Sequence, residues 1–242
     1  MKSDHVTAVR YDEKTGRFTF VPFTRVTMDG HPVFQVMSPG NGIFTLIEYN
    51  KNFADLQGHW AQADIEALAS KWIVKGVTEN GYNPSQPVSR AEFTALLVRS
   101  LGLIPDQASN TFVDVKGDEI LSGEIGAAVK IGLVQGNAGK DGQSFAPNDS
   151  LSRSELAVMI ARTIRIIQGN SASSATNSIG LSSRFQDYSS IPSWAVQDIA
   201  WLVEQEIMKG DTKGAFDPQG TTTRAEAAVI LVRTLKALKL ID

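Results

Sequence analysis

PVSRAEF, residues 87–93, is the stretch that decides the fold, because LSRSEL at 151–156 and TTRAEA at 222–227 repeat its pattern before a similar apolar run. A Ser or Thr followed three positions later by Glu is typical of a capping box, in which the hydroxyl and the carboxylate satisfy backbone N–H groups at a helix start. The sequence therefore predicts three helix starts. Their N-caps are Ser89, Ser152 and Thr223, and their third helical residues are Glu92, Glu155 and Glu226.

Capping does not explain the arginines at the first helical position, Arg90, Arg153 and Arg224. A cation there opposes the helix dipole and costs about 0.3–1 kcal/mol. One hypothesis is an anion site, in which the guanidinium joins free N–H groups of the helix start. The alternative is that each arginine pairs with a carboxylate of a neighbouring repeat, and the two hypotheses can coexist. The candidate carboxylates are Asp55, Asp114 and Asp187.

The arginine motif is one part of a longer repeat that begins at Phe53, Phe112 and Phe185. Each repeat runs Phe-x-Asp, a helical run, a glycine, an aromatic-x-Pro, the arginine motif and a second helical run. We expect the glycines to end the first helices, since glycine tolerates the positive φ of a helix end, and the prolines to take the preceding residue out of the helix. The glycines are Gly76, Gly136 and Gly210. One helix–loop–helix unit cannot bury its apolar faces alone, whereas three units together can.

These repeats divide the chain. The predicted parts are a first repeat at 53–104, a second at 112–167, a mobile Ser-rich linker at 168–184 and a third repeat at 185–240. Residues 1–52 are β-rich and predict a meander of four short strands, which would be marginal alone. This segment is either the tail of an upstream domain or packs on the helices. It could self-associate through strand edges. Because every repeated polar feature begins at Phe53, we expect 1–52 to be dispensable for ligand binding.

Composition excludes several classes of function. The net charge of −3 gives no field that favours nucleic acid. The absence of cysteine removes disulfides and thiolate chemistry, and no apolar stretch is long enough for membrane insertion. The three histidines lack a metal-ligand spacing, and the repeated glutamates are committed to caps, so we expect no catalysis, no metal and no cofactor. The first ten residues lack a signal-peptide core, so we expect a fragment of a longer protein.

Taken together, the repeated features over roughly 53–240 resemble those of the S-layer homology (SLH) family. Its Thr-Arg-Ala-Glu motif corresponds to Ser89–Glu92, Ser152–Glu155 and Thr223–Glu226, and only the third matches letter for letter. The resemblance implies a mainly α fold, in which three repeats form a pseudo-threefold spindle around a central helical bundle. It also implies a secreted protein of the bacterial cell surface, cell wall or S-layer.

The same resemblance implies non-covalent anchoring to a secondary cell-wall polysaccharide that carries pyruvate on an amino sugar. The binding grooves would lie between repeats, where the arginine of one repeat and the Asp or Trp region of another hold the acidic sugar. Trp60 and Trp194 either stack on sugars or belong to the core, and Ile120 replaces the aromatic residue in the second repeat. The candidate glycan-binding residues are Arg90, Arg153, Arg224, Asp55, Asp114, Asp187, Trp60, Trp194, Gly76, Gly136 and Gly210. The alternatives are a self-assembly or dimerisation module, or the non-catalytic part of a wall-active glycoside hydrolase.

Overall fold

The computed structural model describes residues 6–13, 16–38, 40–106, 111–117, 120–139, 142–169 and 179–241. Helices dominate this part of the chain, as predicted. They are α1 (Gln62–Ser70), α2 (Arg90–Ser100), α3 (Ser122–Lys130), α4 (Arg153–Gln168), α5 (Ile179–Arg184), α6 (Val196–Glu204) and α7 (Arg224–Ala237), with 3₁₀ turns η2 (Ala54–Leu56) and η4 (Tyr188–Ser190). The strands are β1 (Val6–Asp12), β2 (Arg17–Phe20), β3 (Phe23–Met28), β4 (His31–Val36), β5 (Ile43–Glu48), β6 (Asn137–Gly139) and β7 (Gly142–Ser144).

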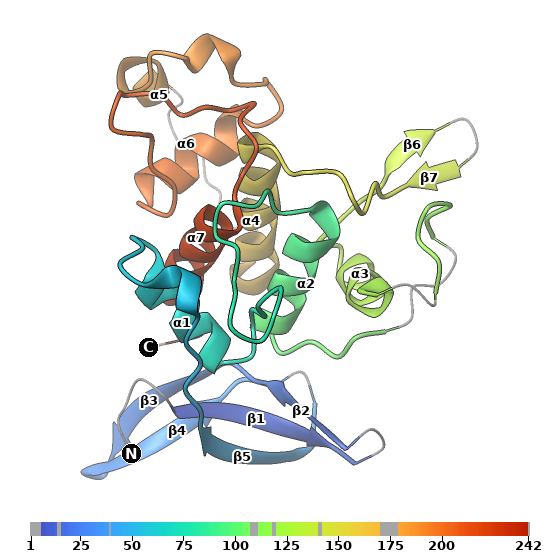
Figure 1. Cartoon of the computed structure of the whole chain (residues 1–242), viewed down its shortest axis with the longest axis vertical. Coiled ribbons are helices and arrows are strands. Elements are labelled where there is room, and N and C mark those ends of the chain that lie inside the picture. The colour runs from blue at the N-terminus through green and yellow to red at the C-terminus, as the bar shows by residue number, and fades with distance from the viewer. Residues whose placement is uncertain are drawn as a thin grey trace.

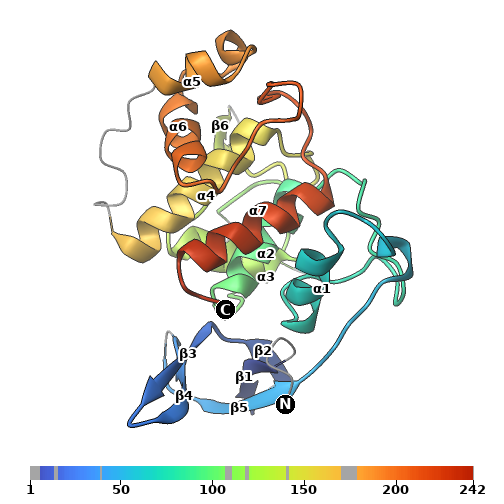
Figure 2. The same cartoon turned by 90° about the vertical axis from the view of Figure 1, so that its left-hand side faces the viewer.

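The second helices of the repeats, α2, α4 and α7, lie together at the centre of the helical part (Figures 1 and 2). Each first helix packs mainly against the second helix of another repeat: α1 against α7, α3 against α2, and α6 against α4. A repeat therefore does not fold back on itself. It buries its apolar face against the preceding repeat, and the first repeat follows the third, so the packing closes into a cycle.

The residues just before the N-caps close the same cycle through the backbone. Val88 N donates to Thr222 O at 3.0 Å, Thr222 N to Leu151 O at 2.9 Å, and Leu151 N to Val88 O at 3.1 Å. All three residues are almost fully buried. Because buried N–H groups need partners, this ring fixes the three helix starts relative to one another.

The three repeat glycines do not end helices, so that prediction is wrong. The first helices end earlier, in turns where Trp72, Gly132 and Glu206 have φ of 59°, 75° and 57°. Gly76, Gly136 and Gly210 lie six residues beyond these helices without a positive φ. Glycine is needed at these positions because neighbouring atoms leave no room for a side chain. A Cβ on Gly76 would lie 2.6 Å from the Phe53 ring, and a Cβ on Gly210 would lie 2.5 Å from the Phe185 ring.

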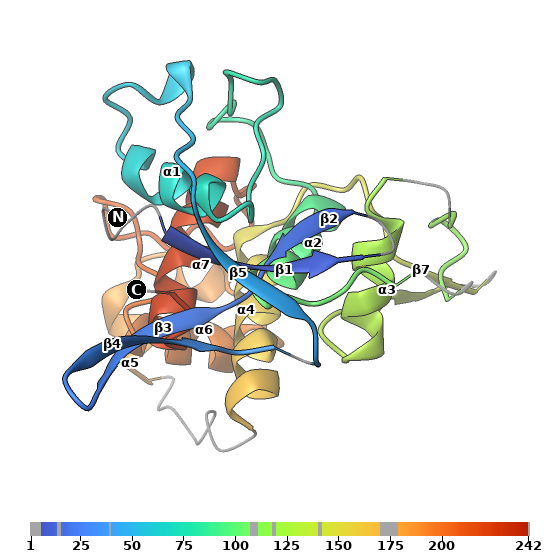
Figure 3. The same ribbon diagram turned by 90° about the horizontal axis from the view of Figure 1, so that it is seen from below.

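The described part of the β segment has five strands rather than four, arranged as a three-stranded antiparallel sheet β2-β1-β5 and a hairpin β3-β4. The hairpin turns at Asp29 and Gly30, which both have positive φ. The segment packs across one end of the helical part (Figure 3), with Phe20 and Phe23 in the common apolar core and Phe23 N donating to Leu240 O at 3.3 Å. Of the two expectations for this segment, packing on the helices is therefore observed.

Part of the predicted linker 168–184 is helical. Residues 170–178 of this linker lie outside the described residues, but α4 continues through Gln168 and residues 179–184 form α5. Leu181 of α5 is 3 % exposed and belongs to the core. The Ser-rich composition of the linker gives no sign of this buried leucine. Among the described helices, none has the length and apolar character needed to cross a membrane.

Candidate functional site

All three predicted capping boxes are present. Ser89 Oγ accepts from Glu92 N at 3.2 Å, and the Glu92 carboxylate accepts from Ser89 N at 2.8 Å. The pairs Ser152–Glu155 and Thr223–Glu226 repeat this geometry. Each cap fixes a helix start and, with it, the direction in which the following arginine leaves the helix.

The helix starts have no free N–H groups, so that part of the anion-site hypothesis is wrong. Arg90 N donates to Asp149 O at 2.9 Å, and Ala91 N donates to Pro147 O at 3.0 Å. At the second helix start, Arg153 N donates to Gly220 O and Ser154 N donates to Pro218 O. At the third, Arg224 N donates to Gln86 O and Ala225 N donates to Pro84 O. The aromatic-x-Pro loop of the next repeat supplies these carbonyls, which the sequence alone does not place there. A ligand at a junction therefore cannot use these backbone N–H groups.

The arginine side chains bridge neighbouring repeats. Arg224 of the third repeat donates from Nη2 to Lys75 O at 2.9 Å and from Nε to Tyr82 O at 3.1 Å, pairs with Glu92 at 3.3 Å, and lies 4.5 Å over the Tyr82 ring. Cation–π geometry of this kind adds to the attachment. Tyr82 is almost fully buried, and this burial raises its pKa to about 12.

Arg153 and Arg90 make the equivalent contacts with the next repeat. Arg153 donates to Lys209 O, lies 5.1 Å over the Phe216 ring and approaches Glu226 at 3.8 Å. Arg90 donates to Gln135 O at 2.8 Å and lies 5.0 Å over the Phe145 ring. Burial lowers the pKa of both guanidinium groups, and the nearby carboxylates of Glu226 for Arg153 and Glu155 for Arg90 oppose this.

The predicted partners of the arginines, the Phe-x-Asp carboxylates, have a different role. Asp55 accepts from Tyr82 N at 2.9 Å and from Asn83 N at 2.7 Å. Asp114 binds the backbone of Phe145 and Ala146 in the same way, and Asp187 binds that of Phe216 and Asp217. The residues before proline in these loops, Asn83, Ala146 and Asp217, have φ near +57°. Each aspartate thus holds the loop that carries the aromatic ring beneath an arginine, while the ion-pair partners at two junctions are capping-box glutamates.

The aromatic residues before the first helices are exposed rather than buried. Trp60 is 65 % exposed and Trp194 is 58 % exposed, while Ile120 at the equivalent position is 91 % exposed. A core role for these tryptophans is therefore wrong. Their faces are accessible to a ligand.

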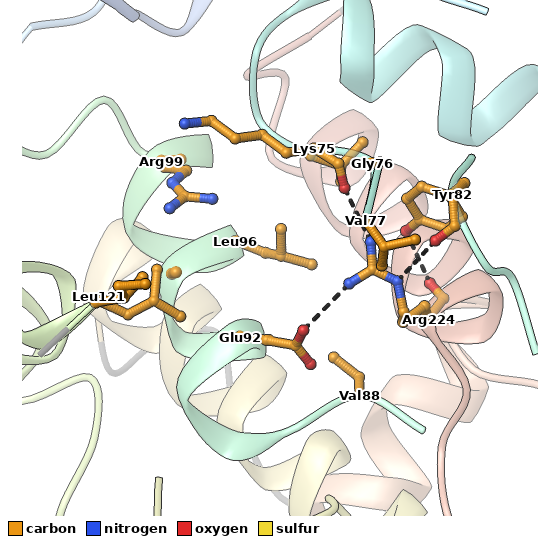
Figure 4. A pocket seen from close by; sticks show the side chains of 13 residues that line it. Lys75, Gly76, Val77, Tyr82, Val88, Glu92, Leu96, Arg99, Leu121 and Arg224 are labelled. Carbon is orange, nitrogen blue, oxygen red and sulfur yellow. Dashed lines mark hydrogen bonds and ion pairs between the residues drawn. The ribbon is translucent and has the colours of Figure 1, made fainter. Parts of the chain in front are cut away.

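A pocket of about 290 Å³ lies beside Arg224 (Figure 4). Its cationic lining residues are Lys75, Arg99 and Arg224, and Glu92 is the acidic one. Arg99 also donates to Glu124 at 2.6 Å. The aliphatic lining residues are Val74, Val77, Val88, Ala95, Leu96, Ile120 and Leu121. The pocket thus has both cationic and apolar lining residues, and it brings Ile120 of the second repeat into the same lining as Arg224 of the third.

A pocket of about 180 Å³ lies beside Arg153. It contains Gly210, Phe216 and Glu226 at positions equivalent to Gly76, Tyr82 and Glu92 of the Arg224 pocket. Asp211 and Asp217 also line it, so carboxylates outnumber the one guanidinium. Sequence reasoning missed Lys75 and the ring under each arginine, although the recurring aromatic-x-Pro was a visible signal. In the described residues, no group of three or more His, Asp or Glu side chains could hold a metal ion.

Fold and site together define a repeat protein whose units close on one another through their arginine motifs. The chain belongs to the S-layer homology family, whose model matches residues 52–94 and 184–228. The second repeat lies outside both matched segments, yet its capping box, aspartate contacts and arginine geometry follow the other two.

The chain is similar to larger proteins. It is 36 % identical over 193 residues to an amylopullulanase of Thermoanaerobacterium thermosulfurigenes and 35 % identical over 191 residues to exoglucanase XynX of Acetivibrio thermocellus, covering 80 % and 79 % of this chain. It is 27 % identical over 212 residues, or 87 % of this chain, to an S-layer protein of Bacillus thuringiensis subsp. finitimus. The matches span 10 %, 17 % and 24 % of those relatives. Its family and S-layer relatives identify a secreted protein associated with the cell surface and cell wall.

Proposed function

We propose that this chain anchors a larger protein to the bacterial wall by binding a pyruvylated secondary cell-wall polysaccharide between repeats, and that the three repeats form a pseudo-threefold spindle. The cyclic exchange of helices, backbone bonds and arginines supports the spindle. The observation that carries the binding proposal is the Arg224 pocket, whose lining has three cations and one carboxylate.

The chemistry of this pocket suits an acidic sugar. A guanidinium offers paired donors that match a carboxylate, and a partly buried site strengthens the contact relative to water. Arg224 is already attached to Lys75 O, Tyr82 O and Glu92, so its position is fixed before a ligand arrives. The apolar lining residues would contact the less polar substituents of the sugar. Fixing the donors in advance lowers the entropy cost of binding.

We propose no catalytic role for this chain, because its motif glutamates cap helices and pair with arginines instead of facing each other across a cleft. Its enzyme relatives are much longer, so hydrolysis would belong to other parts of such proteins.

The test is a pull-down of the chain by purified wall polysaccharide before and after chemical removal of pyruvate. We expect retention by the native polymer and loss after depyruvylation, with no new reducing ends. Equal retention by both polymers would rule out pyruvate as the recognised group. The appearance of reducing ends would instead favour hydrolysis.

A further inference from the structure

A third pocket, of about 500 Å³, lies where the β segment meets the first repeat. Tyr49 and Lys51, which follow β5, line one part of it. The other lining residues are Phe53, Ala69, Trp72 and residues 74–79. Neither the capping motifs nor the inter-repeat arginines contribute to this pocket.

Trp72 is held in an unusual conformation in this pocket. Its φ of 59° is left-handed, where the second repeat has Gly132 and a bulky residue is uncommon. Its ring packs edge-on against Tyr49 at 5.8 Å and lies 6.3 Å from the Phe18 ring. Tyr49 and Phe18 are 37 % and 43 % exposed. The β segment therefore holds a half-buried indole in place, and a ring fixed in advance costs a ligand little ordering entropy.

Polar groups surround this aromatic surface. Lys51 Nζ donates to Glu79 O at 2.5 Å and lies 5.5 Å over the Phe53 ring, which holds its ammonium group in place. Lys75 and Thr78 on the opposite wall are exposed. Aromatic faces combined with a few cations and hydroxyls suit a ligand with an apolar ring face and polar or acidic edges. A sugar ring of an acidic polysaccharide has this character.

The two pockets share a wall. Residues 74–77 line both this pocket and the Arg224 pocket, so a polymer seated beside Arg224 needs only to cross this segment to reach Trp72. The two pockets are continuous, and lysines line the pocket at Trp72. Both features favour the acidic cell-wall polysaccharide as the ligand of this pocket.

We propose that the pocket at Trp72 is a second saccharide subsite, which binds a further unit of the same acidic polysaccharide. Trp72 and Tyr49 stack on its sugar ring, and Lys51 and Lys75 donate to its acidic or hydroxyl groups. The proposal rests on the function proposed above. It reverses the expectation that residues 1–52 are dispensable, because they supply Tyr49 and Lys51 and fix Trp72 in place.

The test compares two pyruvylated fragments of the wall polymer by calorimetry, one of a single repeating unit and one of several. Tyr49→Ala and Trp72→Ala should weaken binding of the long fragment by about two- to tenfold, the range expected for one aromatic contact, and leave the short fragment unaffected. Phe44→Ala is the matched control, because Phe44 is equally exposed on β5 but does not line the pocket.

The outcomes separate the two proposals. If the wild type binds both fragments and Tyr49→Ala binds the long fragment as tightly as the wild type does, the second subsite is overturned and the proposed function stands. Failure of the wild type to bind either fragment overturns the proposed function and this inference with it. If Trp72→Ala does not fold, Tyr49→Ala, which alters an exposed ring, decides the question.

Discussion

At the junction between the third and first repeats, Arg224 lies over Tyr82 and its Nε donates to Tyr82 O at 3.1 Å. At the junction between the second and third repeats, Arg153 lies over Phe216, and its buried Nε has no hydrogen-bond partner in the described part of the chain. The ion pairs differ in the same direction, at 3.3 Å for Arg224 with Glu92 and 3.8 Å for Arg153 with Glu226. The same motif thus attaches one arginine more tightly than the other.

The surroundings of the two arginines differ more than their attachments. Lys75 adds positive charge beside Arg224, while the charge of Arg99 is paired with Glu124. Asp211 and Asp217 instead add negative charge beside Arg153. An anion is therefore favoured at the first junction and opposed at the second. The motif builds the junction, and residues outside the motif decide what the junction can bind.

The largest expected effect is the loss of binding in Arg224→Ala. A charge-assisted contact to a carboxylate contributes about 1.5–3 kcal/mol, which corresponds to a loss of about ten- to a hundredfold. Arg153→Ala should bind nearly as the wild type does. Calorimetry with a short pyruvylated fragment measures both, and Arg224→Lys serves as the control that keeps the charge without the paired donors. If Arg90→Ala, Arg153→Ala and Arg224→Ala all lose affinity equally and strongly, the junctions do not differ in binding. If none of the three loses affinity, the arginines do not bind the fragment.

The loop under Arg224 offers a second test, through Asp55. Burial opposes ionisation of this carboxyl group, but hydrogen bonds from Tyr82 N and Asn83 N outweigh it and hold its pKa below the ordinary value of 3.8. A depressed folded-state pKa stabilises the protein above the unfolded-state pKa, and this stability is lost as pH falls through the folded-state value.

We therefore expect Asp55→Asn to lower the free energy of unfolding by about 1 kcal/mol at pH 7. The gap to the wild type should narrow below about pH 4, where the wild-type carboxylate takes up its proton. Urea unfolding at pH 7 and pH 3 measures this. A gap that is the same at both pH values would mean that the carboxylate charge does not hold the loop.

An effect of similar size is expected from the cap that positions Arg153. Ser152→Ala should cost about 1 kcal/mol of stability, since it removes the acceptor for Glu155 N. It should leave polysaccharide binding unchanged, because the Arg153 junction contributes little. Thermal unfolding and calorimetry measure the two effects, with the exposed Ser183→Ala on α5 as control. Loss of affinity in Ser152→Ala would show that the junctions are more alike than their charges suggest.

The sequence was informative where the interactions are local. Capping boxes join residues three apart, so Ser89 and Glu92 were predictable from spacing alone. The partner of Arg224 could not be predicted in this way, because Glu92 lies 132 residues away and meets it only through the closed cycle of repeats. Part of the requirement for Gly76 arises from the Phe53 ring, which packing brings to 2.6 Å from where a Cβ would lie. The exposure of Trp60 likewise depends on packing around α1, so it cannot be predicted from the composition of the chain.

The smallest and most specific effect concerns Asp217, which has φ of 57° and lines the Arg153 pocket. Its equivalent in the first repeat is Asn83, at φ 58°. Asp217→Asn therefore places the first repeat's residue in the third, with the same shape and tolerance of positive φ. The backbone bond from residue 217 N to Asp187 does not depend on the side chain. Only the negative charge near Arg153 changes.

We expect Asp217→Asn to raise the residual affinity of an Arg224→Ala variant about two- to fivefold, since an exposed carboxylate contributes up to about 1 kcal/mol. The gain should fall at high salt, because screening weakens interactions between exposed charges. Asp64→Asn, which removes a carboxylate from the first turn of α1, is the control for net charge. Unchanged affinity in Asp217→Asn, or an equal gain in Asp64→Asn, would show that the acidic residues at the Arg153 junction are not what separates it from the Arg224 junction.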